Sequence, residues 1–362
     1  AEDEVTSMRN RAGFDHLEFK PRVLRDVSDI DTRTTVLGRE TAMPVVLAPT
    51  GFGRIADSQG ELAVCRAAAR AGLPYTLSTM ATRSIEEVSH AQEAQAAGAE
   101  PRRWFQVYVW KDKGLLEELL SRAADAGFES IMITVDTAVL GRRERDVRRG
   151  FTLPPKVGLD TIVDGALHPG WTWDFVRADP IRFANVVGRD DVDGSHAVSL
   201  ADHINSQFEQ SLSWADVEWF QSVWDGPVTL KGIQTVDDAC IAADLGIDAI
   251  ALSNHGGRQL DGAPPPIELV APVADEVGGR TEIYCDGGVR RGSDIVKALA
   301  SGANAVMIGR AYLYALGAAG ERGVDWVLDF LDAGLRQTMA LSGVRTIGEI
   351  TPDLIRRRPD QT

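Results

Sequence analysis

The feature of this sequence that most constrains its fold is a series of short apolar runs repeated along the chain. Eight runs, rich in β-branched and aromatic residues, occupy residues 44–48, 74–78, 104–108, 130–134, 228–231, 249–253, 282–286 and 305–309. Most follow one another at roughly 30-residue intervals, the length of one strand plus its returning helix. Because the runs are almost continuously apolar, each predicts a strand that is covered on both faces, as in a parallel sheet.

The segments between the runs predict helices. ELAVCRAAARAG at 61–72 and LLEELLSRAADAG at 115–127 have helical patterning and end in glycine, the residue favoured just beyond a helix C-terminus. Eight alternating units favour an α/β fold whose strands close into a TIM (β/α)8 barrel. A doubly wound open sheet is the alternative, but even spacing of parallel strands favours closure.

One long interval follows the fourth run. This insert, from about Gly141 to Ser213, contains LPP at 153–155, HPGWTWDF at 168–175 and the acidic tract GRDDVDG at 188–194. Loops this long in a compact domain are typically functional. We therefore expect a mobile lid or contact segment at about 155–212, with packing on the barrel rim as the alternative.

The insert also carries Trp171, Trp173 and Phe175 close to arginine, a combination typical of segments that touch a membrane interface. After it, WADVEWFQSVW at 214–224 predicts an amphipathic helix leading into the fifth strand. No linker divides the chain, so we expect residues 1–362 to form one domain.

Composition excludes several classes of protein. The formal net charge of −15 disfavours a nucleic-acid partner, because phosphate backbones are repelled. No apolar run approaches the ~20 residues of a membrane-spanning helix, and the start AEDEVTSMRN does not resemble a signal peptide. Cys65, Cys240 and Cys285 are odd in number and far apart, which favours a reducing, cytoplasmic location and predicts no metal site.

Polar residues collect where the runs end. In a (β/α)8 barrel the active site lies at the C-terminal ends of the strands. Those ends supply Pro49, Thr50, Ser78, Gln106, Tyr108, Thr134, Asp136, Lys231, Ser253, Asn254, His255, Asp286, Gly287, Gly288, Gly309 and Arg310. Strand ends that served only stability would not be this polar, so we expect the active site here.

The last two runs predict a phosphate site. They end in DGGVRRG at 286–292 and IGR at 308–310. Glycines let backbone N–H groups approach an anion, and Arg290 and Arg310 can each bind phosphate through two hydrogen bonds. GFGRIA at 51–56 matches the dinucleotide fingerprint, but the next strand lacks the acidic residue that binds the ribose.

A candidate general base follows the sixth run. In SNHGGRQLDG at 253–262, His255 stands on a glycine-rich loop, where a core role is unfavourable and proton transfer is favoured. Asp136, at the end of the fourth run, is the candidate that orients it. GRRERDVRR at 141–149 is rich in arginine; most of these charges predict a solvated face, whereas one or two could bind a substrate carboxylate.

Several motifs together resemble the FMN-dependent L-2-hydroxy acid oxidase/dehydrogenase family from residue 1 to about 350. They are SNHGGRQLDG, WFQVYVW at 104–110, TVDTAVLGRRERD at 134–146, LKG at 230–232 and DGGVRRGSDIVKALASGANAVMIGRAYLY at 286–314. HPGWTWDF, SLSWADVEWFQSVWDGP and GRAYLYALGAAGERGV are most similar to the bacterial L-lactate dehydrogenase branch. Glycolate oxidase and mandelate dehydrogenase are also similar.

The resemblance implies a role for each matching residue. His255 would be the active-site base and Asp136 its partner. The substrate would be bound by Tyr108, Met80, Arg143 and Arg258, the two arginines holding its carboxylate. Lys231 would lie at the N1/O2 edge of the flavin. The other cofactor contacts would be Ala48, Pro49, Thr50, Ser78, Gln106, Thr134, Ser253, Asp286, Gly288, Arg290, Gly309 and Arg310.

The activity implied is FMN-dependent oxidation of an L-lactate-like 2-hydroxy acid to the 2-oxo acid. Gly51 and the insert favour a dehydrogenase that uses a quinone-type acceptor, with an oxidase that forms H2O2 from O2 as the alternative. The resemblance also implies a homotetramer with peripheral contact at the cytoplasmic face of the membrane. From the residues alone, a phosphate-binding isomerase or aldolase using Lys231 is an alternative, but it leaves His255 and Arg258 without a task.

Overall fold

The computed structural model describes residues 1–95, 100–148, 163, 165–186 and 208–359. Its central feature is a closed barrel of parallel strands: β4 (Val45–Leu47), β5 (Tyr75–Ser78), β6 (Arg103–Tyr108), β7 (Ser130–Thr134), β8 (Val228–Ile233), β9 (Ala249–Ser253), β10 (Glu282–Asp286) and β11 (Ala305–Ile308). Neighbouring strands follow chain order, and β11 pairs with β4 to close the ring. This confirms the (β/α)8 barrel, each predicted run forming one strand, and the open sheet is wrong.

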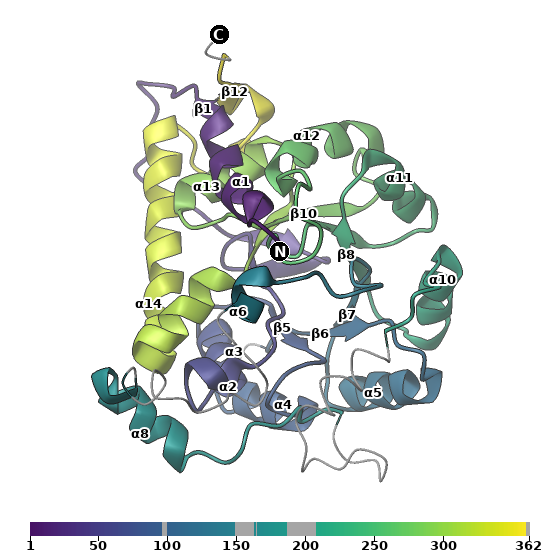
Figure 1. The fold of residues 1–362 in the computed structure, drawn as a ribbon. Coiled ribbons are helices and arrows are strands. Elements are labelled where there is room, and N and C mark those ends of the chain that lie inside the picture. Colours follow the sequence, from purple (N-terminus) through teal and green to yellow (C-terminus); the bar gives the residue numbers. More distant parts are fainter. Residues whose placement is uncertain (96–99, 149–162, 164, 187–207, 360–362) are drawn as a thin grey trace.

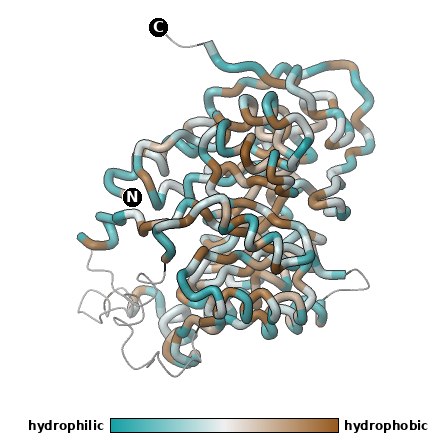
Figure 2. The backbone as a smooth tube through the Cα atoms, turned by 90° about the vertical axis from the view of Figure 1, so that its right-hand side faces the viewer, coloured by the Kyte–Doolittle hydropathy of each residue, from teal (hydrophilic) through white to brown (hydrophobic). Residues whose placement is uncertain are grey.

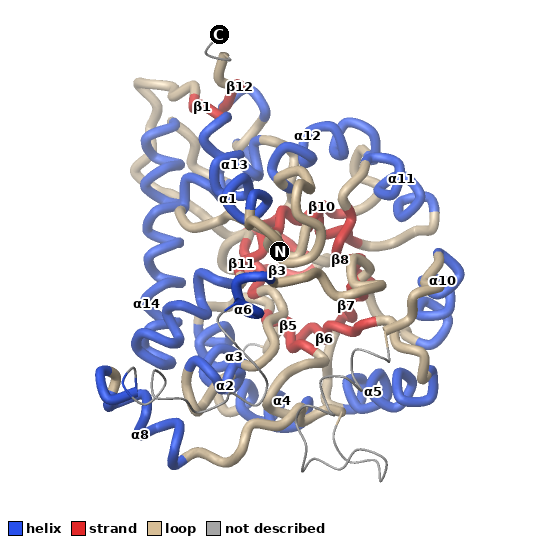
Figure 3. Tube along the Cα trace, in the orientation of Figure 1, coloured by secondary structure: helices blue, strands red, loops and turns tan. Residues whose placement is uncertain are grey.

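Helices surround the barrel, as Figures 1 and 3 show: α3 (Glu61–Arg70), α4 (Ile85–Glu93), α5 (Lys113–Asp125), α10 (Trp214–Val223), α11 (Val236–Asp244), α12 (Pro266–Val277), α13 (Gly292–Ala300) and α14 (Arg310–Ser342). Two of the glycines that predicted helix ends, Gly72 and Gly127, have φ of +66° and +72°, the left-handed conformation that stops a helix. The helix predicted at 214–224 is α10.

A small core fills the inside of the barrel, where Trp104 stacks on Tyr284 with ring centroids 5.9 Å apart. The hairpin of β2 (Thr34–Val36) and β3 (Arg39–Thr41) packs its Val36 into the same core. Beside it, the backbone N–H of Leu37 donates to the carboxylate of Glu282, the first residue of β10. The hairpin therefore covers the N-terminal end of the barrel, and a site can open only at the other end.

The chain ends lie outside the barrel. Near the C-terminal ends of the strands runs α1 (Val5–Ala12), and β1 (Leu17–Phe19) pairs antiparallel with β12 (Ile355–Arg357). Asn10 of α1 exchanges two side-chain hydrogen bonds of 2.7 Å with Asn254, which follows β9. This amide pair attaches the N-terminal helix to the loop that follows β9.

The insert contributes two short helices to the described part of the chain, α6 (Glu144–Arg148) and α8 (Pro169–Arg177). The carboxylate of Asp174 in α8 accepts hydrogen bonds from the backbone N–H and hydroxyl of Ser58, at 2.9 and 2.7 Å. Residues 153–155 and 188–194 lie outside the described residues. The mobility of the insert stays a prediction.

Hydropathy follows this architecture. In Figure 2 hydrophobic and hydrophilic stretches alternate along the chain, as expected when each helix turns one face to the barrel. No helix in the described ranges combines the length and apolar character needed to span a bilayer.

Candidate active site

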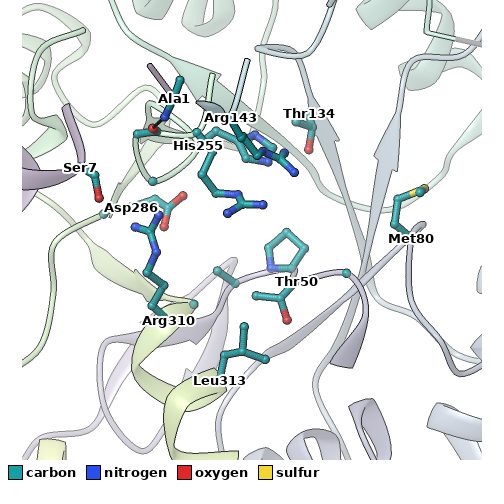
Figure 4. A pocket seen from close by; sticks show the side chains of 18 of the residues that line it. Ala1, Ser7, Thr50, Met80, Thr134, Arg143, His255, Asp286, Arg310 and Leu313 are labelled. Carbon is teal, nitrogen blue, oxygen red and sulfur yellow. Dashed lines mark hydrogen bonds between the residues drawn. The ribbon is translucent and has the colours of Figure 1, made fainter. Parts of the chain in front are cut away.

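A cavity of about 570 Å³ opens at the C-terminal end of the barrel. The predicted site residues that line it are Ala48, Pro49, Thr50, Met80, Gln106, Tyr108, Thr134, Arg143, Lys231, His255, Arg258, Asp286, Gly288, Arg290, Gly309 and Arg310. In Figure 4 Arg310 and Asp286 lie on one side of this cavity and Met80 on the opposite side. The other predicted residues, Ser78, Asp136 and Ser253, stand behind the wall, each hydrogen-bonded to a lining residue.

One wall is formed by the end of β4. The hydroxyl of Tyr312, in α14, donates to the carbonyl oxygen of Ala48 at 2.7 Å and lies 2.8 Å from the hydroxyl of Thr50. Tyr312 is fully buried, so it holds this wall in place from behind. It belongs to the matched segment GRAYLY, but no residue-level signal had singled it out.

A chain of polar side chains crosses three neighbouring strands. The Ser78 hydroxyl donates to Oε1 of Gln106, and Nε2 of Gln106 donates to the hydroxyl of Thr134, both at 2.9 Å. All three side chains are buried. The chain fixes the orientation of the Gln106 amide and leaves the Thr134 hydroxyl proton free to donate towards the cavity.

A buried charge pair lies on the next strands. The ammonium of Lys231 is 3.1 Å from Oδ2 of Asp286 and donates to the Ser253 hydroxyl at 3.1 Å, while that hydroxyl donates to Asp286 at 2.7 Å. Burial disfavours the charged form of Lys231, but attraction to Asp286 and Asp136 outweighs it and raises the pKa. Lys231 is therefore a cation at neutral pH.

His255, the proposed general base, is hydrogen-bonded to Asp136, with Nδ1 of the imidazole 3.0 Å from Oδ1 of the carboxylate. Asp136 is 3% exposed and His255 20%. Because Nδ1 is occupied, Nε2 is the nitrogen left for a substrate. His255 has φ of +57°, and Gly256 and Gly257 follow at +66° and +73°, so three consecutive left-handed residues make the sharp turn that presents the imidazole.

Four guanidinium groups, those of Arg143, Arg258, Arg290 and Arg310, line the cavity, although the protein as a whole carries −15. Desolvation, and then repulsion from Arg143 and Arg310, lowers the pKa of Arg258 to about 10. Desolvation followed by repulsion from Arg310 also lowers the pKa of Arg290. Within the described residues none of these four arginines forms an ion pair, which indicates a site built for anions.

Aromatic and aliphatic side chains form the remaining wall beside Met80. Phe52 packs edge-on against Phe183 with ring centroids 4.6 Å apart, and Tyr108 packs edge-on against Phe208 at 5.3 Å. Phe183 and Phe208 come from the insert, and sequence reasoning did not find them. Nothing in their local sequence indicates that these two rings reach the cavity.

The residues present fit FMN. Unpaired guanidinium groups at the ends of β10 and β11 match one phosphate, and the buried Lys231 ammonium matches a ring that becomes negative on reduction. Arg143 and Arg258 are then left for a second, carboxylate anion. No group of three or more potential metal-ligating side chains occurs in the described part of the chain.

The chain is similar in sequence to known proteins over nearly its whole length. The family model for FMN-dependent dehydrogenase matches residues 1–357. The chain is 40% identical over 359 residues to an L-lactate dehydrogenase of Caulobacter vibrioides (98% of this chain, 91% of that protein). It is 42% identical over 351 residues to glycolate oxidase 3 of Arabidopsis thaliana (97% and 88%).

Among solved structures, the monotopic membrane protein (S)-mandelate dehydrogenase has a TM-score of 0.92 at 38% identity, with 99% of this chain and 92% of that chain covered. A mandelate oxidase has a TM-score of 0.81 at 36% identity, with 98% and 90% covered. These matches confirm the family that the motifs indicated and exclude the isomerase or aldolase. The chain belongs to the FMN-dependent dehydrogenase family of 2-hydroxy acid oxidoreductases, with FMN as its cofactor.

Proposed function

We propose that the protein oxidises an L-lactate-like 2-hydroxy acid to the 2-oxo acid and passes the electrons to a quinone-type acceptor. The observation that carries the substrate class is one cavity that combines the His255–Asp136 pair with Arg143 and Arg258, two guanidinium groups without a carboxylate partner in the described residues. A small hydroxy acid presents the complementary groups, a carboxylate beside a C–H and an O–H.

Substrate orientation would come from the two arginines and Tyr108. A guanidinium holds a carboxylate through two parallel hydrogen bonds, which fixes the orientation of the plane as well as the position. The Tyr108 hydroxyl is available as a further donor, and its raised pKa, caused mainly by burial, keeps it protonated at neutral pH. Met80 is on the apolar wall, where the substrate side chain would lie.

His255 would accept the proton through Nε2. The Asp136 carboxylate holds Nδ1 and stabilises the imidazolium that forms. Two routes are compatible with this arrangement, one removing the proton from Cα and one from the hydroxyl. When bound, FMN supplies the two-electron redox chemistry of the reaction.

The remaining predicted residues would hold the cofactor. Arg290, Arg310, Gly288 and Gly309 would bind the phosphate, with Asp286 and Ser253 beside the ribityl chain. Ala48, Pro49 and Thr50 would cover one ring face, and Ser78, Gln106 and Thr134 would hold the ring edge. Lys231 would stabilise negative charge at the N1/O2 edge.

The electron acceptor is tested by comparing turnover under air with turnover on a quinone analogue or dichlorophenolindophenol. We expect rapid turnover only with the artificial acceptors, since Gly51 and the similarity to L-lactate dehydrogenases favour a dehydrogenase. The likeness to glycolate oxidase supports the alternative acceptor, O2. Stoichiometric H2O2 formed at a rate equal to that of the artificial acceptor would refute the dehydrogenase proposal.

We also propose that α8 contacts the cytoplasmic face of a membrane. Leu167, Trp173 and Val176 are 72%, 62% and 72% exposed, and the guanidinium of Arg177 lies 4.2 Å from the centroid of the Trp173 ring. Exposed apolar and aromatic side chains next to a cation are typical of interfacial helices. A related structure of (S)-mandelate dehydrogenase is described as a monotopic membrane protein.

Cosedimentation with vesicles of phosphatidylcholine and phosphatidylglycerol tests this contact. We expect the Trp173→Ala variant to lose most of its bound fraction. Trp326→Ala is the matched control, because Trp326 in α14 is equally exposed, at 64%. Equal binding by both variants would contradict the proposal.

Light scattering of the protein in solution tests the homotetramer that the family resemblance implies.

A further inference from the structure

The two loops that carry the proposed substrate-binding groups are not neighbours in the barrel. Asp136 and Arg143 follow β7, whereas His255 and Arg258 follow β9, and β8 lies between the two strands. No strand ladder therefore aligns one loop with the other. The N-terminal segment is hydrogen-bonded to both loops, at Arg142 and at Asp261, and direct contacts between the two loops complete their alignment.

Gln259 supplies most of these contacts. Its Nε2 donates to the backbone carbonyl oxygens of Asp136 and Val139 at 2.8 and 2.9 Å, and its Oε1 accepts from the backbone N–H of Gly141 at 2.9 Å. The side chain is buried, at 8% exposure. Two acceptors face the amide nitrogen and one donor faces the amide oxygen, so only one orientation of the amide satisfies all three bonds.

Packing alone does not hold the first loop. A second cavity, of about 580 Å³, adjoins it and is lined by Asp136, Val139, Gly141 and Gln259 together with apolar residues of α10. The loop therefore has space into which it could move. A Cβ on Gly141 would overlap the carbonyl oxygens of Arg258 and Gln259, so the two loop backbones are in direct contact there.

We propose that Gln259 is a positioning residue that aligns the Asp136–Arg143 loop with the His255–Arg258 loop. The inference rests on the proposed function for what the aligned groups do. By binding three backbone groups of one loop while standing next to Arg258 in the other, Gln259 sets both the imidazole–carboxylate contact and the spacing of the two guanidinium groups. Displacement of reacting groups by about 1 Å can cost roughly 100-fold in rate.

The test compares Gln259→Met with a matched control, Gln92→Met, in the FMN-loaded protein. Methionine keeps the volume of the side chain but removes the amide. Gln92, in α4, is also buried and donates to a backbone carbonyl, that of Cys65 at 3.2 Å, but it does not line the cavity. Both variants lose buried hydrogen bonds, so both report the cost in stability.

For Gln259→Met we expect kcat per bound FMN to fall about 10- to 100-fold and KM to rise, with FMN content retained. Gln92→Met should keep the wild-type kcat per bound FMN and the wild-type KM, even if its melting temperature falls. Gly141→Ala, which separates the same backbones by steric contact, should behave like Gln259→Met. If Gln259→Met kept the wild-type kcat per bound FMN and the wild-type KM, the inference would be overturned.

Two readouts independent of turnover separate this inference from the proposed function. Hydrogen exchange at the Gly141 amide should accelerate in Gln259→Met and stay unchanged in Gln92→Met. The affinity for oxalate, followed by the absorbance of the bound flavin, should fall about tenfold or more in Gln259→Met. If the unaltered protein oxidises no 2-hydroxy acid, the proposed function fails; unchanged exchange and oxalate affinity in Gln259→Met would then still overturn the positioning role.

Discussion

Asp136 keeps its negative charge in a place where burial alone would remove it. Its side chain is 3% exposed, and desolvation pushes the pKa upwards. Attraction to His255, the hydrogen bond from its imidazole and the nearby Lys231 outweigh this effect, and the net pKa is lowered. A carboxylate held ionised beneath an imidazole can stabilise the cation that forms when the imidazole accepts a proton.

The first prediction at this scale concerns His255. His255→Ala should retain FMN and lower turnover by roughly 10²- to 10⁴-fold, because it removes the imidazole that Asp136 orients to accept the substrate proton. His90→Ala, an exposed histidine in α4, is the control. Stopped-flow flavin reduction is the measurement, and near-normal reduction in His255→Ala would refute the mechanism.

The second prediction concerns the planar guanidinium group of Arg258. Arg258→Lys preserves charge but replaces a planar fork by a point charge, so one of the two hydrogen bonds to a carboxylate is lost. KM should rise about tenfold or more, with a smaller change in kcat. Arg142→Lys, at the largely exposed neighbour of Arg143, should leave KM unchanged. A loss confined to kcat would argue against carboxylate binding by Arg258.

At the scale of elements, capping residues stabilise the helices, whereas the loops that follow the strands hold the functional side chains. In α4, the Ser84 hydroxyl accepts from the backbone N–H of Glu87 at 3.1 Å, and the Glu87 carboxylate accepts from the backbone N–H of Ser84 at 2.8 Å. This capping box satisfies two donors at the start of the helix. The helix packs against α3 and α5, and Ser89 accepts a hydrogen bond from Arg103 of β6, whereas no residue of α4 lines the cavity.

This separation of roles predicts the effect of removing the cap. Ser84→Ala should lower the free energy of unfolding by about 0.5–2 kcal/mol, the usual contribution of an N-cap. Because α4 does not line the cavity, kcat per bound FMN should stay at the wild-type value. Chemical denaturation combined with steady-state kinetics measures both, and a reduced kcat per bound FMN would show that the supporting helices are coupled to the site.

At the scale of the whole molecule, the barrel places residues from distant parts of the sequence around one cavity, and the outer hydrophobic core runs continuously between strands and helices. We propose that residues 1–362 therefore unfold as one domain. Thermal unfolding followed by far-UV circular dichroism and by flavin fluorescence should give coincident transitions. Two separated transitions would show that the insert or another part of the chain folds independently.

The same molecule should lose stability in acid. Hydrogen bonding to Arg122 lowers the pKa of Glu86 to about 2, and the net pKa shifts of Asp136 and Glu321 are also downward. The unfolded chain therefore binds more protons than the folded one between about pH 4 and 2. Stability from these carboxylates is fully present above about pH 5 and falls as the pH drops through that range. Denaturation midpoints should stay level from pH 6 to about pH 5 and decrease from there to pH 3; midpoints that stay constant over the whole range would contradict the assignment.

Much of the site could be predicted because parallel strands in a barrel all end at the same rim. Tyr108, Lys231 and Asp286 are far apart in the chain, yet each ends an apolar run, so local pattern and barrel topology together place them in one cavity. The pattern alone indicated a general base at His255, its partner Asp136 and a phosphate site after the last two runs; the other roles came from resemblance to a known family. Residues that approach the cavity from outside the strand ends had no such local signal.

The strands, the helices between them and the polar rim could all be predicted from the amino-acid sequence, because continuous apolarity and glycine stops act over a few residues. Three features emerge from the folded chain alone: Phe183 and Phe208 complete the apolar wall, Asn10 pairs with Asn254, and Gln259 joins the loops that follow β7 and β9. These contacts depend on how distant segments pack, and short-range patterns carry no information about a partner more than one hundred residues away.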